Sequence, residues 1–256
     1  MSIDRTVVTS FLAGARRGPE RRVADADLER LPAPVRRYVQ YTGAAGTAVP
    51  ATVRMQQRGT IRQGPGRRWN TFAAEEYFTT DPGGFLWIAK ARTSPFMSAT
   101  VVDRYQGGTG RMTVQVMGRL TVADDGSPEM NASSLVRYLN ELMWIPAALA
   151  TAPIAWEAVD DHTARATLRD GPNTATGTFH VDGEGRLTNF TASRYRQAGR
   201  GRPSLQSWSV PVSDFGERAE LRLPARAEGT WSTEKSDFTY VRLYADVIDY
   251  NVPAPF

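Results

Sequence analysis

Hydrophobic positions in the middle of the chain recur with helical spacing. From Ser133 to Ala150 (SSLVRYLNELMWIPAALA) an apolar side chain returns every three or four residues, which places these side chains on one face of a helix. Asn131 or one of the two opening serines, Ser133 and Ser134, is suited to cap its start. Pro146 lacks a backbone donor and clashes with the carbonyl four residues earlier, so the helix is expected to kink or restart there. We predict a helix over residues 131–150 that needs a large apolar surface to pack against.

Both flanks of this helix alternate between apolar and polar positions with period two, which is the pattern of β-strands. Residues 49–124 contain five such segments separated by short turns, and further segments follow between residues 154 and 250. These turns are too short to hold crossover helices, so neighbouring strands are expected to pair antiparallel.

Several of the strands are apolar on both faces. In RRWNTFAAEEYFTT, for example, Trp69, Glu75 and Tyr77 share one face, and Phe72 and Phe78 share the other. Two apolar faces indicate a curved sheet whose concave side packs against other parts of the chain. We therefore predict an α+β fold that is mostly antiparallel: a strongly curved open sheet, or incomplete barrel, with the central helix and N-terminal helices covering its concave face.

The N-terminal part of the chain has a different pattern from the rest. Residues 1–45 are predicted to be helical, with Gly43 ending the last helix. We expect them to form a helical segment packed on a curved-sheet domain of residues 46–256, into which helix 131–150 is inserted. No long linker interrupts the sequence, so we expect a single structural domain of 256 residues.

Composition narrows the functional classes only slightly. Hydrophobic residues make up 41% of the chain, which is typical of a globular protein, and the net charge of +4 is modest. The absence of cysteine excludes disulfides, thiolate nucleophiles and cysteine-ligated zinc. No apolar run approaches the roughly 20 residues of a membrane span.

The N-terminal sequence MSIDRTVVTSFLAGARR has some features of a signal peptide. Asp4 lies near its start, and Thr9 and Ser10 interrupt a short apolar run. An amphipathic surface helix, with Val7, Val8, Phe11 and Leu12 on one side, fits this pattern better. A cytoplasmic location is therefore expected.

Several motifs resemble an uncharacterised bacterial family that is known only as a domain of unknown function. The motifs are APVRRYVQYTG, GRRWNTFAAEEYFTTDPGGFLWIAKAR, RYLNELMWIPAAL and WEAVDDHTARATL, and the resemblance runs from about Leu31 to Asn251. The chain departs from the family pattern at Asp81-Pro82-Gly83-Gly84, where the family often has two prolines, and at Ile145, where phenylalanine is usual. The family itself implies no activity.

The order of elements is also similar to that of outer-membrane lipoprotein carrier proteins. That fold is an open, strongly curved antiparallel sheet whose concave face is filled by helices. At the level of the fold alone, this likeness implies binding of an apolar ligand.

The polar side of the central helix is the first candidate site. Glu141 and Tyr138 are placed to hydrogen-bond a ligand head group inside the concave face, with Trp144 as a wall. In the simpler alternative, Arg137 and Glu141 form an ion pair four residues apart on a partly exposed helix, which contributes only about 0.2–0.5 kcal/mol.

A second candidate group lies on the first strands. Glu75 shares a face with Trp69 and Tyr77, and Asp103 lies on a later strand, so two carboxylates are available as a general acid and base. Strand register cannot be fixed from the sequence, and carboxylates that simply face solvent are the alternative.

Other site classes lack their sequence signals. The two histidines, His162 and His180, have no metal-ligand spacing, and neither a P-loop nor a GxSxG motif occurs. The loop QAGRGRPS carries Arg200 and Arg202 but is isolated and lacks stacking aromatics. We therefore expect no metal, no cofactor and no nucleic-acid partner.

These observations favour a non-enzymatic binder of an apolar or amphipathic small molecule, such as a lipid or acyl chain, held between sheet and helix. The candidate ligand-binding residues are Trp69, Glu75, Tyr77, Phe85, Trp87, Tyr138, Glu141 and Trp144. One alternative is a hydrolase-type enzyme that uses Glu75, Asp103 or Glu141. Another is a structural or partner-binding protein whose concave face is completely filled; no catalytic residue and no protein partner is assigned.

Overall fold

The strands of the protein form one continuous antiparallel sheet. The computed structural model describes residues 5–256 except 17, 95–96, 119, 198–201 and 234–235. Within this part of the chain the sheet has thirteen strands in the order β6-β5-β4-β3-β2-β1-β13-β12-β11-β10-β9-β8-β7. Their bounds are Thr52–Ile61 (β1), Asn70–Thr80 (β2), Gly83–Ser94 (β3), Met97–Gln106 (β4), Thr109–Val116 (β5), Leu120–Asp125 (β6), Ile154–Asp160 (β7), Thr163–Asp170 (β8), Asn173–Val181 (β9), Leu187–Arg196 (β10), Ser204–Arg218 (β11), Leu221–Ser232 (β12) and Asp237–Tyr250 (β13).

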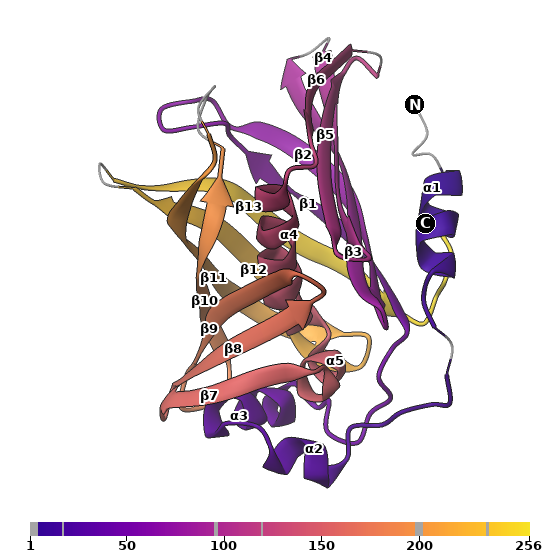
Figure 1. Cartoon of the computed structure of the whole chain (residues 1–256), viewed down its shortest axis with the longest axis vertical. Coiled ribbons are helices and arrows are strands. Elements are labelled where there is room, and N and C mark those ends of the chain that lie inside the picture. The colour runs from indigo at the N-terminus through magenta and orange to yellow at the C-terminus, as the bar shows by residue number, and fades with distance from the viewer. Residues whose placement is uncertain (1–4, 17, 95–96, 119, 198–201, 234–235) are drawn as a thin grey trace.

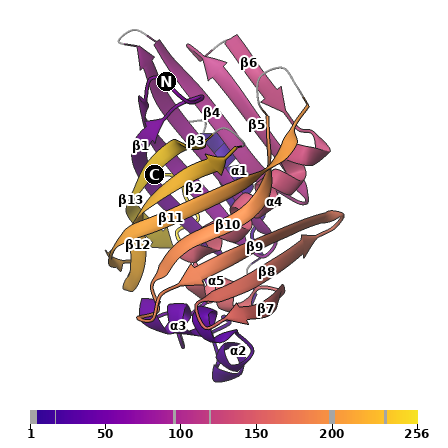
Figure 2. The same ribbon diagram turned by 90° about the vertical axis from the view of Figure 1, so that its left-hand side faces the viewer.

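The sheet consists of two meanders joined at its centre. Strands β1 to β6 form one and β7 to β13 the other, and they meet where β1 pairs with β13 from Val53↔Tyr250 to Ile61↔Val241. The joined sheet is curved into a half-barrel with α4 on its concave side, and β6 and β7 are its two edge strands (Figures 1 and 2). The predicted fold class, a strongly curved open antiparallel sheet, is confirmed.

The central helical segment lies in the hollow of the sheet, between β6 and β7 in the sequence (Figure 1). It comprises α4 (Pro128–Glu141), a 3₁₀ turn (Leu142–Trp144) and α5 (Pro146–Thr151). The predicted restart at Pro146 is confirmed, since α5 begins there. The predicted caps are wrong, because the side chain of Ser127 accepts the hydrogen bond from the Met130 backbone N–H. The helix therefore starts earlier than its apolar stripe.

The apolar face of this segment is buried. Leu135, Leu139, Leu142, Ile145 and Leu149 are all buried in the main core. Burial of a leucine or isoleucine side chain contributes about 1.5–3 kcal/mol, so this stripe is a major part of what holds the two meanders on one core.

The first helix, α1 (Arg5–Ala13), lies on the other side of the sheet. Its buried residues Val8, Phe11 and Leu12 pack on Tyr77, Leu86 and Ile88, in a cluster separate from the main core. In β2, the side chain of Glu76 points to α4, so that of Tyr77 points outward. The expectation that the N-terminal helices cover the concave face is therefore wrong for α1, because β2 and β3 carry a second apolar surface on the outside.

The other N-terminal helices close one end of the half-barrel. They are α2 (Asp25–Glu29) and α3 (Ala33–Thr42), which lie near α5 (Figure 1). The hydroxyl of Tyr38 in α3 donates to the carbonyl oxygen of Met143 over 2.6 Å, which ties α3 to the central segment. Gly43 ends α3 with φ of 79°, as predicted.

One predicted strand is two strands in the structure. The segment 111–124 divides into β5 and β6, which pair with each other from Met112↔Asp125 to Val116↔Leu120. The hairpin turn uses positive φ angles at Met117 (53°) and Gly118 (67°). Gly118 was the available sequence signal for this turn, because glycine adopts positive φ without steric cost.

Candidate functional site

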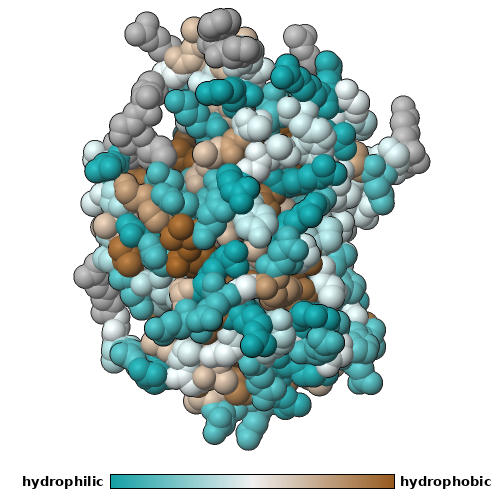
Figure 3. All heavy atoms as spheres, turned by 180° about the vertical axis from the view of Figure 1, so that it is seen from behind, coloured by the Kyte–Doolittle hydropathy of each residue, from teal (hydrophilic) through white to brown (hydrophobic). Residues whose placement is uncertain are grey.

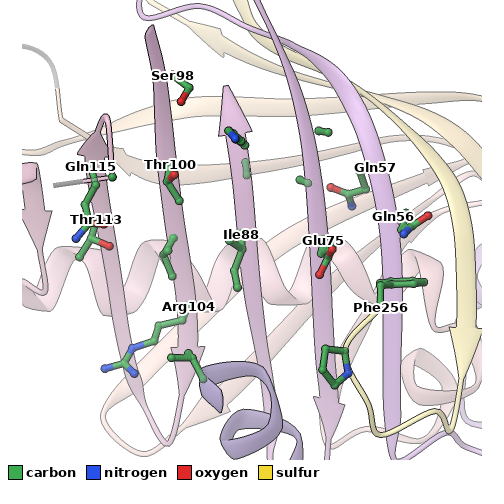
Figure 4. A pocket seen from close by; sticks show the side chains of 18 of the residues that line it. Gln56, Gln57, Glu75, Ile88, Ser98, Thr100, Arg104, Thr113, Gln115 and Phe256 are labelled. Atoms are coloured by element: carbon green, nitrogen blue, oxygen red, sulfur yellow. The ribbon is translucent and has the colours of Figure 1, made fainter. Parts of the chain in front are cut away.

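A long groove runs over the outer face of the sheet, on the side away from α4. Its volume is about 1160 Å³, and its walls come from β1 to β5, α1 and the segment 255–256. The apolar part of its lining includes Val7, Ala73, Ile88, Val102 and Phe256. Figure 4 shows Ile88 in the middle of the groove, Thr100 and Thr113 on one side, and Glu75 and Phe256 on the other.

The apolar lining arises from strand alternation. Every second side chain of β3, β4 and β5 points outward, so Ile88, Val102 and Thr113 come to lie on one surface. Over the rest of the face seen in Figure 3, hydrophobic side chains lie in small groups separated by hydrophilic ones. The groove therefore combines apolar side chains with a hollow shape.

The groove has more positive than negative charge available to a ligand. Arg58 pairs with Asp246 and Arg111 with Asp124 at its edges. Lys90 and Arg104 also line the groove and are exposed, and neither has an ion-pair partner in the described part of the chain. Arg104 stands directly opposite Arg111 across β4 and β5. Arg111 is paired with Asp124 of β6, and Arg104 on its other side adds a second guanidinium group, so this end of the groove has a net positive charge.

The one acidic side chain in the centre of the groove is already engaged. The hydroxyl of Tyr77 donates to Glu75 Oε2. Burial raises the pKa of Tyr77 well above its usual value, and the hydrogen bond to Glu75 raises it further. The ring of Tyr77 contacts that of Phe256, over which Arg54 stacks at 4.3 Å. Tyr77 therefore fixes both Glu75 and one end of the groove.

A separate polar cluster is buried on the inner face, between α4 and the sheet. Arg137 of α4 binds three carboxylates: Glu76 (2.6 Å), Asp103 (2.8 Å) and Glu141 (2.7 Å). Its guanidinium lies over the ring of Phe85, with 4.6 Å to the ring centroid. The predicted Arg137–Glu141 pair forms, but in a buried network rather than on an exposed helix.

The network continues into the sheet. Trp87 Nε1 donates to Gln57 Oε1 over 2.9 Å, and Gln57 Nε2 donates to Glu76 Oε2 over 2.6 Å. One oxygen each of Asp103 and Glu141 is buried without a hydrogen-bond partner in the structure. The described residues contain no group of three or more acidic or histidine side chains suited to a metal ion. This cluster is therefore arranged around a guanidinium.

Burial sets the protonation of the carboxyl groups. Desolvation raises the pKa of Glu76 well above its usual value, and the neighbouring Glu141 raises it further, while Arg137 opposes both. Burial likewise raises the pKa of Glu141, again against Arg137. One guanidinium does not balance three buried carboxylates, so the cluster retains protons at a pH where exposed carboxyls have lost theirs.

The sequence-derived site residues do not form one site. Phe85, Trp87 and Glu141 meet around Arg137 on the inner face. Glu75 and Tyr77 lie on the outer face, and Trp69 lies at the start of β2, between Arg62 and Arg242. Glu75 and Asp103 are thus on opposite faces of the sheet, with β3 between their strands. These two carboxylates cannot act as one acid–base pair.

Two other candidates are packed tightly. Trp144 is only 1% exposed, and its Nε1 donates to the Pro224 carbonyl oxygen over 2.9 Å. The Tyr138 hydroxyl donates to the Thr79 carbonyl oxygen over 3.2 Å. Both residues are occupied with holding the central segment to the sheet, and neither lines the outer groove.

Sequence reasoning missed most of the groove residues. Ile88, Lys90, Val102 and Arg104 were available from strand alternation, because they fall on the same face of neighbouring strands. The sequence did not predict where α1 and Phe256 lie, and these form walls of the groove on this face. Glu76 was also missed, since alternation alone does not show which face points inward.

A second, smaller hollow of about 750 Å³ lies where β9 and β10 separate. These strands pair only as far as Gly177↔Ala192. Beyond this point α4 fills the gap, and the Ser133 side chain donates to the Tyr195 carbonyl oxygen over 3.2 Å. Many of the lining residues are serines and threonines, so this hollow offers less apolar surface than the outer groove.

Comparison with known proteins identifies one matching sequence family and several solved structures of similar fold at low sequence identity. A profile described as "Family of unknown function (DUF6544)" matches residues 21–243. A DUF1329 family protein from Desulfovibrio piger is similar with 13% identity over 91% of this chain and 95% of that one, at a TM-score of 0.47. A LolA superfamily protein from Nitrosomonas europaea is similar with 10% identity over 89% and 93%, at a TM-score of 0.43. No curated protein matches the sequence.

Proposed function

The chain belongs to the DUF6544 family, whose function is unknown, and from its geometry we propose that it binds an amphipathic small molecule in the outer groove. The ligand class is a single acyl chain with an anionic head group, such as a fatty acid. The observation that carries the proposal is that one groove of about 1160 Å³ combines an apolar lining with Lys90 and Arg104, which have no ion-pair partner among the described residues.

The size and shape of the groove suit an elongated ligand. Small-molecule sites are usually roughly 300–1,000 Å³, and this groove exceeds that range because it is open along its length. The acyl chain would lie along Ile88, Val102 and Phe256, the apolar residues of the lining. Each methylene group that is fully buried contributes about 0.8 kcal/mol, so affinity should increase with chain length until the groove is filled.

The positive end of the groove would hold the head group. Arg104 has no ion-pair partner within the described residues, and it faces Arg111 across the strand pair. A carboxylate or phosphate bound there would make charge-assisted hydrogen bonds, which are stronger than neutral ones. This arrangement selects anionic over neutral amphiphiles.

The proposal places the ligand on the outer face rather than in the sheet–helix hollow that the sequence suggested. Support comes from the packing of Tyr138 and Trp144, whose polar atoms are already hydrogen-bonded to the sheet. Lys90 and Arg104 of the groove, in contrast, are exposed and have no ion-pair partner among the described residues.

Binding can be tested by native mass spectrometry of the purified protein and by displacement of an apolar fluorescent dye with fatty acids. We expect affinity to rise by up to about 15-fold for each two carbons added, because two buried methylenes contribute roughly 1.6 kcal/mol. Arg104→Gln should weaken binding of fatty acids but not of the corresponding alcohols. Ala73→Trp should weaken both, because Ala73 lies exposed in the groove.

Arg169→Gln is the matched control, since Arg169 is also exposed but lies on β8, away from the groove. Its affinity should equal that of the unmodified protein. If neither bound lipid nor dye displacement is observed, the proposed function is wrong. If displacement occurs but Ala73→Trp leaves it unchanged, the outer groove is not the binding site.

A further inference from the structure

Five hairpin ends of the sheet gather at one end of the half-barrel. They connect β1 to β2, β3 to β4, β5 to β6, β10 to β11 and β12 to β13, and they lie in the upper half of Figure 1. We call this end the rim and define it as the described residues within 61–69, 90–98, 116–121, 194–205 and 232–238. Antiparallel pairing explains this arrangement, because every second turn of a meander lies at the same end of its strands.

The rim has a strong excess of positive charge. Its basic residues are Arg62, Arg67, Arg68, Lys90, Arg92, Arg194, Arg196 and Arg202, and its acidic residue among those described is Asp237. None of these basic side chains is in an ion pair, judged over the residues that the structure places, whereas many arginines elsewhere pair with a carboxylate. Arg194 is buried and donates to Ser133, and Arg62 donates to the Thr239 carbonyl oxygen. The exposed cations that the rim presents are Arg67, Arg68, Lys90, Arg92 and Arg202.

The rim also exposes aliphatic side chains at its turns. Met117 is 67% exposed, Leu120 65%, Leu205 57% and Met97 43%, and these four are half of the exposed large hydrophobic residues in the described part of the chain. Aliphatic side chains on protruding turns, surrounded by cations, match the interface of a membrane, where the former insert and the latter meet lipid phosphates.

Three aromatic residues near the rim, Trp69, Trp231 and Phe238, are not available for stacking on bases. Trp231 and Phe238 are buried, and Arg196 lies over both rings, at 5.9 and 4.9 Å from their centroids. Trp69 is covered by the guanidinium groups of Arg62 and Arg242. Single-stranded nucleic acid binds through exposed aromatic platforms, so the exposed Met and Leu side chains favour a lipid surface.

We propose that the rim docks on an anionic lipid surface, with Met117, Leu120 and Leu205 entering the interface and Arg67, Arg68 and Arg202 contacting lipid phosphates. This surface is distinct from the proposed ligand groove, although Lys90 contributes to both. Neither function requires the other, and they are tested separately.

The test is co-sedimentation of the protein with vesicles of phosphatidylcholine alone, and with vesicles of equal parts phosphatidylcholine and phosphatidylglycerol. We expect binding to the anionic vesicles that declines as NaCl is added, and much weaker binding to the neutral ones. Each basic residue close to an anionic surface strengthens partitioning roughly fivefold, so Arg67→Gln/Arg68→Gln should weaken it by about 25-fold. Leu120→Ser/Leu205→Ser should weaken it by roughly tenfold through lost apolar burial.

The matched control is Arg165→Gln/Arg222→Gln, which removes two exposed charges away from the rim. It should bind anionic vesicles like the unmodified protein, and thermal unfolding of each variant verifies that its fold is intact. Absence of sedimentation with anionic vesicles would overturn the proposal, as would equal binding to both vesicle types or equal losses in the control. Binding to a single-stranded oligonucleotide without binding to vesicles would assign the rim to nucleic acid instead.

Discussion

Arg137 Nη2 and Glu76 Oε1 lie 2.6 Å apart, with Glu76 wholly buried beneath α4. This contact joins the central helix to β2 of the first meander, and the same guanidinium reaches Asp103 on β4. A buried ion pair of this kind adds little net stability over well-packed apolar residues, because both ions are desolvated. Its effect is to fix the position of α4 in the hollow of the sheet.

Removal of Arg137 should be strongly destabilising. Arg137→Met leaves three carboxyl groups buried without a cation, which costs about 3–5 kcal/mol of unfolding free energy. The cost should be smaller at about pH 5 than at about pH 8, because Glu76 and Glu141, whose pKa values burial raises, can then take up protons. Urea unfolding at the two pH values measures this difference.

Arg165→Met provides the comparison for this prediction. Arg165 pairs with Glu157 on the surface, where an ion pair contributes only about 0–1 kcal/mol. Similar small losses for both variants would show that the Arg137 cluster is solvated in solution.

Glu76 should make stability depend on pH. Its pKa is raised above the usual 4.5 by burial and by Glu141. Between 4.5 and the raised value, the native state holds a proton that the unfolded state has lost. The free energy of unfolding should therefore fall as pH rises through this window. Glu76→Gln should flatten the decline between about pH 5 and about pH 8.

For Glu76→Gln, the quantity to compare is the slope of the free energy of unfolding against pH, rather than the free energy of unfolding at one pH. The substitution also disturbs the hydrogen bond from Gln57 Nε2, which lowers stability at every pH. Glu75→Gln is a suitable control, because Glu75 is on the outer face and only half-buried. An unchanged slope in Glu76→Gln would mean that Glu76 is ionised throughout this range.

Gly177→Ala should destabilise the second meander. A Cβ atom at this position would lie 2.1 Å from Cζ of Phe190 on the neighbouring strand. Overpacking of a core costs about 1–3 kcal/mol. Gly64→Ala should have little effect, since the nearest atom to its Cβ would be Arg67 Cγ at 3.8 Å. Thermal unfolding of the two variants tests the difference, and equal melting temperatures would contradict the close approach of Phe190.

Phe11→Ala should release α1 from the sheet without unfolding the main core. Phe11 is buried in the small outer cluster with Tyr77 and Leu86, which is separate from the core around α4. Hydrogen exchange should become faster in α1 and stay unchanged in β8 and β9. Val7→Ala, at an exposed position of the same helix, should leave both unchanged. Loss of protection throughout the sheet would show that α1 is integral to the fold.

The sequence predicted the path of the chain well, because local signals determine it. The apolar stripe and Pro146 located the central helical segment, and period-two alternation located all strands of the second meander. The hairpin at Met117-Gly118 was missed because the apolar alternation continues across it. Gly118 was the only local indication of a turn within that segment.

The arrangement of the candidate site was harder to predict, because alternation separates two faces without saying which is inside. Glu75 and Glu76 are adjacent and chemically equivalent, yet only Glu76 reaches Arg137. The outer partner of Tyr77 is α1, and nothing near Tyr77 in the sequence indicates this contact. The location of α1 on the outside therefore had to come from the three-dimensional structure.

The pairing of β1 with β13 has a consequence for how the protein is made. About 200 residues separate Val53 from its partner Tyr250. During synthesis, the first meander leaves the ribosome with β1 unpaired on one side, and it stays so until the last strand emerges. Long-range contacts of this kind slow folding and leave an unpaired strand edge open to association with other chains. Chaperone protection of the nascent β1 edge would be most valuable in that interval.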